Sequence, residues 1–343
     1  MSLPPSEIPS GAMRFNSDSQ KLEYWDGSQW VQVHTFSPNL DGGARGVLMG
    51  GSTTPGPSDD IIDYINISST GDAVTFGTLS VIASFNGEAV SDSTRGVLLG
   101  GRTNVPTPNT TTATMQYVTI SSKGNSTNFG NLQNIRYGMA AFSNSTRGIA
   151  CGGNDGTSST SEIEYITIQS TGNSVDFSGA STTSSNYRTG FSSPTRGISA
   201  GGFQTSVNTI EFVTISTLGE AQDFGDLSIP LWRLGGCSNP IRGIIVAGES
   251  PSSDGLNIME YITISTLGNS TNFGDVSQGG QHYNGTSSST RGVFAGRQDD
   301  SPFANLNNIE YVNIMTEGNA VDFGDLSTPR QGVGACSNAH GGL

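Results

Sequence analysis

Short runs of strand-forming residues, bounded by Gly, Ser, Thr and Asn, recur along the chain. In residues 162–168 (EIEYITI) the β-branched and aromatic residues alternate as a half-buried strand requires. Similar runs lie at 138–143 (GMAAFS), 148–153 (GIACGG) and 174–177 (SVDF). No window of about 11 residues has the apolar spacing of a helix. The pattern predicts an all-β chain.

These four runs form one copy of a repeat. Three markers recur in phase over six copies, and the Arg-Gly marker recurs every 46 to 52 residues. Four antiparallel strands in about 50 residues, repeated around an axis, are typical of a β-propeller blade. We therefore predict a six-bladed β-propeller. The markers are Arg-Gly at Arg45, Arg95, Arg147, Arg196, Arg242 and Arg291, an aromatic residue at Tyr64, Tyr117, Tyr165, Phe212, Tyr261 and Tyr311, and Phe76, Phe129, Phe177, Phe224, Phe273 and Phe323.

The repeats resemble the kelch family over about residues 40–343. Kelch blades end their second strand in Gly-Gly and place aromatic residues in the third and fourth strands. The fourth-strand aromatic is Phe here, where kelch repeats prefer Trp, and the last two copies keep only Gly248 and Gly296. The resemblance implies a propeller architecture and says little about activity. The complete doublets are Gly50-Gly51, Gly100-Gly101, Gly152-Gly153 and Gly201-Gly202.

The two ends of the repeat array predict how the ring closes. The first copy begins at its second strand, ARGVLMGG, and the last ends in a first strand without a second. We expect residues 332–338 to pair with residues 45–51, because closure removes exposed sheet edges. This C-terminal strand would complete the first blade.

Residues 1–36 do not belong to the repeat. They predict a β-meander with strands at 11–16, 21–25 and 29–33, and Asp26-Gly27 is a hairpin turn signal. So small a meander carries many aromatic residues, which we expect to bury against a partner or another copy. We predict an assembly module at 1–36, a linker at 37–43 and the propeller at 44–343. The expected assembly residues are Phe15, Tyr24, Trp25 and Trp30.

This segment is similar to a short module near the N-termini of tailed-bacteriophage virion proteins. The shared pattern is G-x-x-R-F-N, a polar turn, and E-Y-W-D-G-S-x-W-V. In that family the module belongs to fibres and other appendages, which implies assembly with other virion proteins. The matching residues are Gly11, Arg14, Phe15, Asn16, Glu23, Tyr24, Asp26, Gly27, Trp30 and Val31.

Composition and charge narrow the range of partners. Charged residues make up 13% of the chain and the net charge is −14, which argues against binding to nucleic acid. Cys151, Cys237 and Cys336 lie on predicted strands in different blades, so we expect small buried side chains and no disulfide. We expect neither a signal peptide nor a membrane-inserting segment. We expect a virion protein made in the host cytoplasm.

The repeats indicate which end of the ring carries recognition. The turns after strands one and three are nearly constant, as in S-N-S-T-R-G and S-x-x-G-N, and lie at one end of each sheet, here called the constant end. The loops after strands two and four differ in length and composition and lie at the other end, the variable end. Variable loops on a rigid scaffold are the usual place for recognition.

Aromatic and basic residues gather in the loops after strand four. They suggest stacking platforms and hydrogen-bond donors for sugar rings near the mouth of the ring. The alternative is that they wedge between blades, as Arg often does there in kelch repeats. We expect a packing or hydrogen-bonding role for the six Arg-Gly arginines. The candidate binding residues are Trp232, Tyr187, Tyr137, Tyr283, Arg233, Arg188 and Arg136, with Phe85 and His282 beside them.

No catalytic or metal-binding motif is present in the sequence. His34, His282 and His340 are not spaced as ligands, so we expect no metal, no cofactor and no enzyme activity. We expect a phage fibre or other appendage that is a homo-oligomer, with a trimer favoured, and whose propeller recognises a host receptor or glycan. Two alternatives stay open: a structural decoration protein of capsid or tail, and a glycan-degrading propeller enzyme. The enzyme would need an acid pair among loop carboxylates such as Asp59, Asp60, Asp299 and Asp300.

Overall fold

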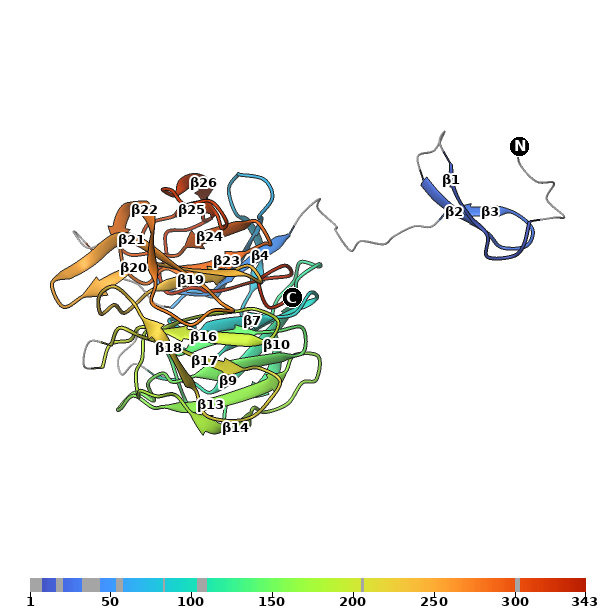
Figure 1. The fold of residues 1–343 in the computed structure, drawn as a ribbon. Helices are drawn as coiled ribbons and strands as arrows, with labels where there is room; N and C mark the ends of the chain where they lie inside the picture. The colour runs from blue at the N-terminus through green and yellow to red at the C-terminus, as the bar shows by residue number, and fades with distance from the viewer. Residues whose placement is uncertain are drawn as a thin grey trace. The chain divides into compact units, whose positions relative to one another are not determined.

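A computed structural model describes residues 8–16, 21–32, 44–53, 58–82, 84–103, 110–204, 207–299 and 303–343 (Figure 1). The chain divides into two compact units, residues 1–40 and residues 41–343. The expected linker at 37–43, His34 and Asp300 lie outside the described residues. Within the described ranges the regular elements are β-strands, so the prediction of an all-β chain is confirmed.

The smaller unit is a three-stranded antiparallel sheet, with strand order β1-β2-β3. Strand β1 begins later than predicted, because the Ala12 N–H bonds to the Pro9 carbonyl in a turn. The predicted turn is present: Asp26 Oδ1 accepts from the N–H groups of Ser28 (2.7 Å) and Gln29 (2.8 Å). These donors lower the pKa of Asp26. The strands are β1 (Met13–Asn16), β2 (Lys21–Trp25) and β3 (Trp30–Gln32).

The larger unit contains six four-stranded antiparallel sheets in its described residues. Each sheet is a meander whose four strands follow the predicted repeat. The first strands are β7 (Glu88–Ser91), β11 (Ala140–Ser143), β15 (Thr189–Ser192), β19 (Gly235–Ser238), β23 (Asn284–Ser287) and β27 (Gly334–Ser337). The second strands are β8 (Arg95–Leu99), β12 (Arg147–Cys151), β16 (Arg196–Ala200), β20 (Arg242–Ser250), β24 (Arg291–Ala295) and β4 (Arg45–Met49).

The third and fourth strands complete each sheet. The third strands are β9 (Thr114–Thr119), β13 (Glu162–Thr167), β17 (Thr209–Thr214), β21 (Ser253–Thr263), β25 (Asn308–Asn313) and β5 (Ile61–Asn66). The fourth strands are β10 (Thr127–Asn131), β14 (Val175–Ala180), β18 (Gln222–Asp226), β22 (Thr271–Gly280), β26 (Val321–Asp325) and β6 (Val74–Thr78). Strands β20, β21 and β22 are longer than their counterparts and extend their sheet toward the variable end.

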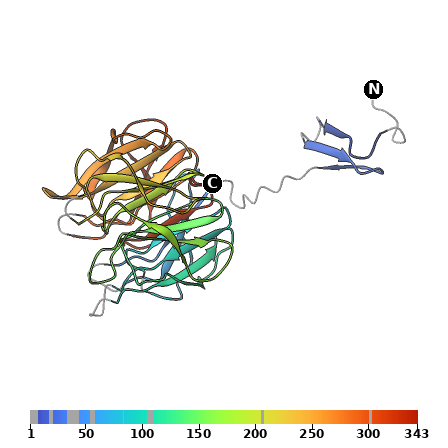
Figure 2. The same cartoon turned by 60° about the horizontal axis from the view of Figure 1, so that its bottom comes forward.

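The C-terminal strand pairs with the first strand of the larger unit, as predicted. Strand β27 lies antiparallel to β4, from Gly334 opposite Met49 to Ser337 opposite Gly46 (Figures 1 and 2). One sheet therefore has the order β27-β4-β5-β6 and joins the two ends of the repeat array. This pairing covers the backbone edge that β4 would otherwise expose.

The hydrophobic core lies between neighbouring sheets. Each of six clusters in the described residues joins the apolar side chains of one sheet to those of the next. One cluster joins the last and first sheets of the chain, with Val293 and Phe323 packed near Leu48 and Ile65. The first strands of neighbouring sheets also contact each other in a closed cycle. The six sheets are thus joined in a cycle without a gap.

The Arg-Gly arginines connect each sheet to the next, so their predicted packing role is confirmed. Arg147, for example, stacks on the Tyr165 ring (4.7 Å to the centroid) and donates to the carbonyl oxygen of Ile215 (3.1 Å). The same two contacts occur in all six sheets. The donor and acceptor pairs are Arg45–Ile120, Arg95–Ile168, Arg147–Ile215, Arg196–Ile264, Arg242–Ile314 and Arg291–Ile67.

The Phe-Gly marker is explained by a close approach between sheets. Gly124 donates its N–H to the Phe76 carbonyl (3.0 Å), and a Cβ on Gly77 would lie 2.1 Å from the Gly124 carbonyl oxygen. A side chain at Gly77 would therefore separate the sheets. In the third copy an extra residue, Ser178, follows Phe177, and Gly179 makes the same approach. Ser178 accommodates the insertion with a φ of +60°.

A ring of serine hydroxyls holds the first strands together at the constant end. Each Oγ donates to the backbone carbonyl of the serine in the neighbouring sheet, at 2.6 to 2.8 Å. Ser91 donates to Ser337 and completes the cycle. A cavity of about 50 Å³ lies inside this ring. The serines are Ser91, Ser143, Ser192, Ser238, Ser287 and Ser337.

The C-terminal tail packs over the serine ring. The His340 ring nitrogen Nε2 lies 2.9 Å from the Ser91 carbonyl oxygen, and burial lowers the pKa of this histidine. A Cβ on Gly342 would lie 1.8 Å from the Ser143 carbonyl oxygen, so the tail is closely packed there. Residues 340–342 thus pack against the serine ring at the constant end.

Candidate functional site at the variable end

A second ring connects the sheets where the first strands begin. Six residues, one from each sheet, are linked by backbone N–H to carbonyl hydrogen bonds of 2.6 to 3.3 Å that return to the starting residue. All six have φ between +53° and +63°, which is the left-handed region. Only two are glycine, so four side chains are held in a conformation that costs about 1 kcal/mol or more each. The residues are Asn86, Gly138, Tyr187, Arg233, His282 and Gly332.

Aromatic side chains gather over this ring. Tyr187 is at the centre of the group, with its ring centroid 5.9 Å from Tyr137, 6.3 Å from Phe203 and 5.7 Å from His282. The rings meet edge to face, the arrangement that aromatic pairs prefer. We call this group, with the two arginines described next, the aromatic cap. Its aromatic members are Phe85, Tyr137, Tyr187, Phe203, Trp232 and His282.

Two arginines, Arg102 and Arg233, complete the cap. The Arg102 guanidinium lies over the rings of Tyr137 (4.3 Å) and Phe85 (5.2 Å) and donates to the Tyr187 hydroxyl (3.2 Å). Arg233 lies over the Tyr187 ring (4.9 Å) and pairs with Glu249. The cap thus holds two guanidinium groups, and that of Arg233 is paired with a carboxylate.

The cap is part packed core and part accessible surface. Trp232 is 8% exposed and donates from Nε1 to Glu249, so it packs in the cap, as the wedge alternative expects. Tyr137 is similarly buried. Phe203, which the sequence interpretation did not select, is 49% exposed, and Tyr187 is half-buried. The accessible platform is therefore Phe203 with Tyr187.

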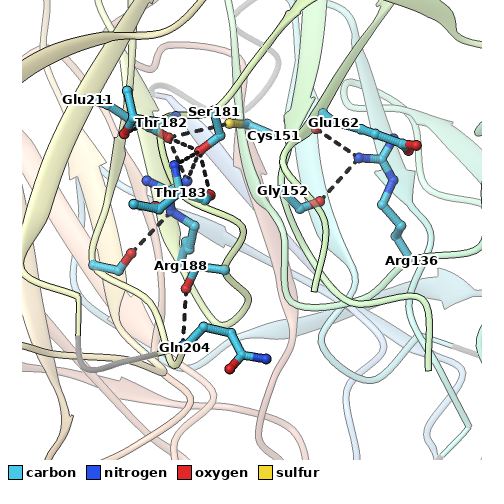
Figure 3. Close-up of polar contacts among 12 residues, drawn as sticks. Arg136, Cys151, Gly152, Glu162, Ser181, Thr182, Thr183, Arg188, Gln204 and Glu211 are labelled. Atoms are coloured by element: carbon cyan, nitrogen blue, oxygen red, sulfur yellow. Dashed lines mark hydrogen bonds and ion pairs between the residues drawn. The ribbon is translucent and has the colours of Figure 1, made fainter. Parts of the chain in front are cut away.

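Arg136 and Arg188 lie beneath the variable loops and outside the cap. The Arg136 guanidinium pairs with Glu164 and donates to the backbone carbonyls of Gly152 (3.2 Å) and Glu162 (3.0 Å). Both arginines are buried and point into their own sheets (Figure 3). Contact with a ligand at the surface would require the loops above them to move.

The partner carboxylates occupy the same third-strand position in several sheets. Arg188 pairs with Glu211 (2.5 Å), Arg330 with Asp63 (3.0 Å) and Arg297 with Glu310 (3.5 Å), in addition to Arg136 with Glu164. Buried charges of this kind need such partners. The position is filled by Asp63, Gln116, Glu164, Glu211, Glu260 and Glu310.

In the β7–β10 sheet this position is neutral. Gln116 accepts there from the hydroxyls of Ser80 and Ser126, both at 2.8 Å. The residue equivalent to Arg136 in that sheet is Ser84. This copy therefore has neither the carboxylate nor the arginine.

Tyr283 is also placed between sheets. The Tyr283 hydroxyl donates to the Gln278 carbonyl (2.9 Å) and accepts a hydrogen bond from Arg297. Burial raises the pKa of Tyr283 above its usual range. Of the seven predicted binding residues, the structure brings together Tyr137, Tyr187, Trp232 and Arg233 in the cap. Tyr283, Arg136 and Arg188 lie below it.

A small polar cavity of about 20 Å³ lies under the ring, enough for a single water molecule. Glu88 lines it and accepts from Asn284 Nδ2 (2.9 Å) on a first strand that is not its neighbour. Burial raises the pKa of Glu88 to about 8. Burial, with the nearby charges of Arg233 and Arg102, lowers the pKa of His282 well below its usual value.

The predicted assembly residues of the smaller unit differ in exposure: some are buried within the unit and others face solvent. Trp25 is buried against Trp30 (5.5 Å between centroids), which corrects the expectation that all four aromatic residues await a partner. Arg14 stacks on Trp30 (4.2 Å) and covers one face of it. Phe15 is 65% exposed, and Tyr24 is also exposed. These two side chains are accessible to a partner.

The three cysteines lie in the interior of the larger unit. Cys151, Cys237 and Cys336 are buried free thiols, as predicted, and burial raises the pKa of Cys151 and Cys336 to about 12. No cluster of three or more His, Cys, Asp or Glu side chains that could hold a metal occurs in the described residues. In the same ranges no helix has the length and apolar character to cross a membrane.

No protein-family model matches the chain, and no curated protein is significantly similar to it.

Proposed function

We propose that this protein is a non-enzymatic appendage of a bacteriophage virion, in which a six-bladed kelch-like β-propeller presents the aromatic cap to a glycan on the host surface. The observation that carries this proposal is the difference between the two ends of the sheets. The constant end repeats one hydrogen-bonded structure in every sheet. The variable end combines non-repeating loops with accessible aromatic and basic side chains.

The propeller assignment rests on cyclic contacts. The first strands contact each other in a closed order, and the serine ring, the positive-φ ring and the Arg-Gly arginines each complete a cycle. Six four-stranded meanders arranged in this way fit the propeller architecture, which leaves only short protected edges. The C-terminal strand would close it through β4.

The recognition proposal rests on the chemistry of the cap. Phe203 and Tyr187 offer ring faces or edges with little side-chain entropy to lose on binding. Arg102 and Arg233 offer planar donors beside them. A polar hollow of about 420 Å³, lined by residues such as Asn134, Asp155 and Thr157, could hold further sugar units. Volumes of this size are typical of small-ligand sites.

Attachment to the particle is assigned to the smaller unit. Its resemblance to phage N-terminal modules and the exposure of Phe15 and Tyr24 support a docking role. The proposed partners are other virion proteins and further copies of this chain, with a trimer favoured. In this proposal the protein is located in the virion.

A second candidate function is decoration of the capsid or tail. Four large apolar side chains, from three successive sheets, are exposed at the constant end and favour packing against a neighbour. They replace polar residues of the other copies, as Leu218 replaces Thr171. These residues are Leu218, Ile241, Leu267 and Met315.

Binding of the full-length protein to a panel of bacterial strains and their purified surface polysaccharides separates these candidates. Binding to some polysaccharides without release of oligosaccharide supports the appendage proposal. Released oligosaccharide would instead identify a glycan-degrading enzyme. If the protein binds no strain and no polysaccharide, decoration of the capsid or tail is the remaining candidate. Association of the protein with purified virion particles then tests that function.

A further inference from the structure

The basic residues of the larger unit differ in how their charge is satisfied. Each Arg-Gly arginine donates to a backbone carbonyl of the next sheet. Five further arginines pair with carboxylates. They are Arg136, Arg188, Arg233, Arg297 and Arg330.

Arg102 follows neither pattern. Among the described residues, its guanidinium donates a hydrogen bond to the Tyr187 hydroxyl, at 3.2 Å. No carboxylate or carbonyl in the described part of the chain accepts from this guanidinium. A half-buried guanidinium that donates to no carboxylate or carbonyl can offer its remaining Nη donors to a ligand.

Contacts within the protein fix the position of Arg102 before any ligand binds. Its backbone exchanges hydrogen bonds with Phe85 in both directions, at 3.0 and 3.1 Å. Its guanidinium lies over the rings of Phe85 and Tyr137, which hold its plane. A planar fork fixed in this way is suited to a carboxylate, which it can bind through two parallel hydrogen bonds.

The surroundings also favour an anion. The nearby charge of Arg233 is balanced by Glu249, whereas that of Arg102 is not balanced by any carboxylate in the described residues. The Tyr187 hydroxyl can donate to an anion while it accepts from Arg102. Tyr187 in turn contacts the exposed ring of Phe203, at 6.3 Å between centroids. A charged group at Arg102 and a sugar ring on Phe203 can therefore belong to one ligand.

From this geometry we infer that Arg102 and the Tyr187 hydroxyl form a subsite for the carboxylate of an acidic sugar, with Phe203 as the stacking platform. The inference rests on the proposed glycan-binding function and names its ligand class. Sulfate and phosphate esters are alternative anions, but the flat two-donor fork fits a carboxylate best.

The test uses the full-length protein and a panel of bacterial surface polysaccharides of known composition. Each carboxylate-bearing member is also presented after chemical reduction of its carboxyl groups to alcohols, and sulfated and phosphorylated members are included. We expect binding of carboxylate-bearing members, loss of about tenfold or more in affinity after reduction, and weakening with salt. Equal binding before and after reduction, or binding restricted to sulfated or phosphorylated members, would overturn the inference.

Two variants and a matched control locate the effect. We expect Arg102→Gln to lose about tenfold or more in affinity per folded molecule, and Arg102→Lys, which keeps the charge without the fork, to lose less. The control is Arg95→Gln. Arg95 belongs to the same sheet as Arg102 and also stacks on a tyrosine, Tyr117, but it lies at the constant end. It should lower stability and leave affinity unchanged. If Arg102→Gln does not fold, the Lys variant decides, and wild-type affinity in it contradicts the inference.

These outcomes separate the inference from the proposal beneath it. Binding to neutral polysaccharides alone, abolished by Phe203→Ala, would leave the recognition function standing and reject the acidic ligand. Absence of binding to every polysaccharide and strain would reject both.

Discussion

Arg291 donates from Nη1 to the carbonyl oxygen of Ile67 at 3.2 Å, although the two residues are 224 positions apart. The same contact links Arg45 to Ile120, and so on through all six sheets. Arg291 also stacks on Tyr311, at 4.6 Å from the ring centroid. The last and first sheets are therefore joined by the same side-chain contact as every other pair, in addition to the β27–β4 pairing.

The first prediction concerns this contact. Arg147→Ala removes the stacking on Tyr165 and the hydrogen bond to Ile215. We expect a loss of about 1–2 kcal/mol in the free energy of unfolding, measured by urea denaturation of the larger unit's transition. Arg14→Ala is the control, because Arg14 makes a similar stack in the smaller unit. An equal response to both changes would show that the Arg147 contact does not join the sheets.

The second prediction concerns closure. Deleting residues 330–343 removes β27 and leaves the β4 edge, Arg45–Met49, without its partner. We expect aggregation or loss of cooperative melting. Deleting only 339–343 removes the tail over the serine ring but keeps β27, so this variant should stay monodisperse and melt cooperatively at a lower temperature. Identical melting of the longer deletion and the full chain would contradict closure through β27.

The third prediction separates packing from display within the cap. Trp232 is buried and bonded to Glu249, so Trp232→Ala should cost roughly 3–5 kcal/mol of stability. Phe203→Ala should cost within about 1 kcal/mol, because half of that side chain is exposed. Chemical denaturation measures both. A small loss for Trp232→Ala would restore it as a candidate platform.

The repeat could be interpreted from the sequence because each marker has a physical cause that recurs. Arg147 must reach the next sheet, and Gly77 must allow a close approach, so both types return in every copy. The pairing of residues 332–338 with 45–51 followed from the two incomplete copies at the ends of the array. The serine ring had a visible signal too, since Ser91 and Ser143 open the same constant turn.

Only part of the candidate site could be predicted from the sequence. Aromatic residues in the loops after strand four were visible, but burial separates Tyr187 from Tyr283, and burial depends on neighbouring sheets. Arg102 and Phe203 come from loops after strand two that have no common pattern, so the repeats gave no signal for them. The positive φ of Tyr187 was hidden as well, because glycine marks this position in only two copies.

The fourth prediction is a pH dependence. Burial raises the pKa of Glu88 to about 8, above its value in the unfolded chain. Between about pH 4.5 and 8 the Glu88 carboxyl is protonated in the folded state and ionised in the unfolded state. The free energy of unfolding therefore falls as pH rises through that window. We expect Glu88→Gln to remove this contribution and to stabilise the protein at pH 8 by on the order of 2 kcal/mol.

Chemical denaturation at pH 5 and pH 8 measures this effect. The control is Asp254→Asn, because Asp254 is exposed at the hairpin of the β19–β22 sheet. It reports the effect of replacing a carboxyl by an amide at an exposed position. A Glu88→Gln protein with the wild-type slope would show that Glu88 is ionised in the folded state at neutral pH.

The central claim is that the variable end recognises the host surface and the constant end does not. Phe203 and Leu218 test it as a matched pair, because both are 49% exposed and they lie at opposite ends of the β15–β18 sheet. The measurement is the affinity of full-length Phe203→Ala and Leu218→Ala proteins for a polysaccharide that the wild type binds, expressed per folded molecule. We predict a loss of about tenfold or more for Phe203→Ala and wild-type affinity for Leu218→Ala. Wild-type affinity for Phe203→Ala, with a loss for Leu218→Ala, would contradict the claim.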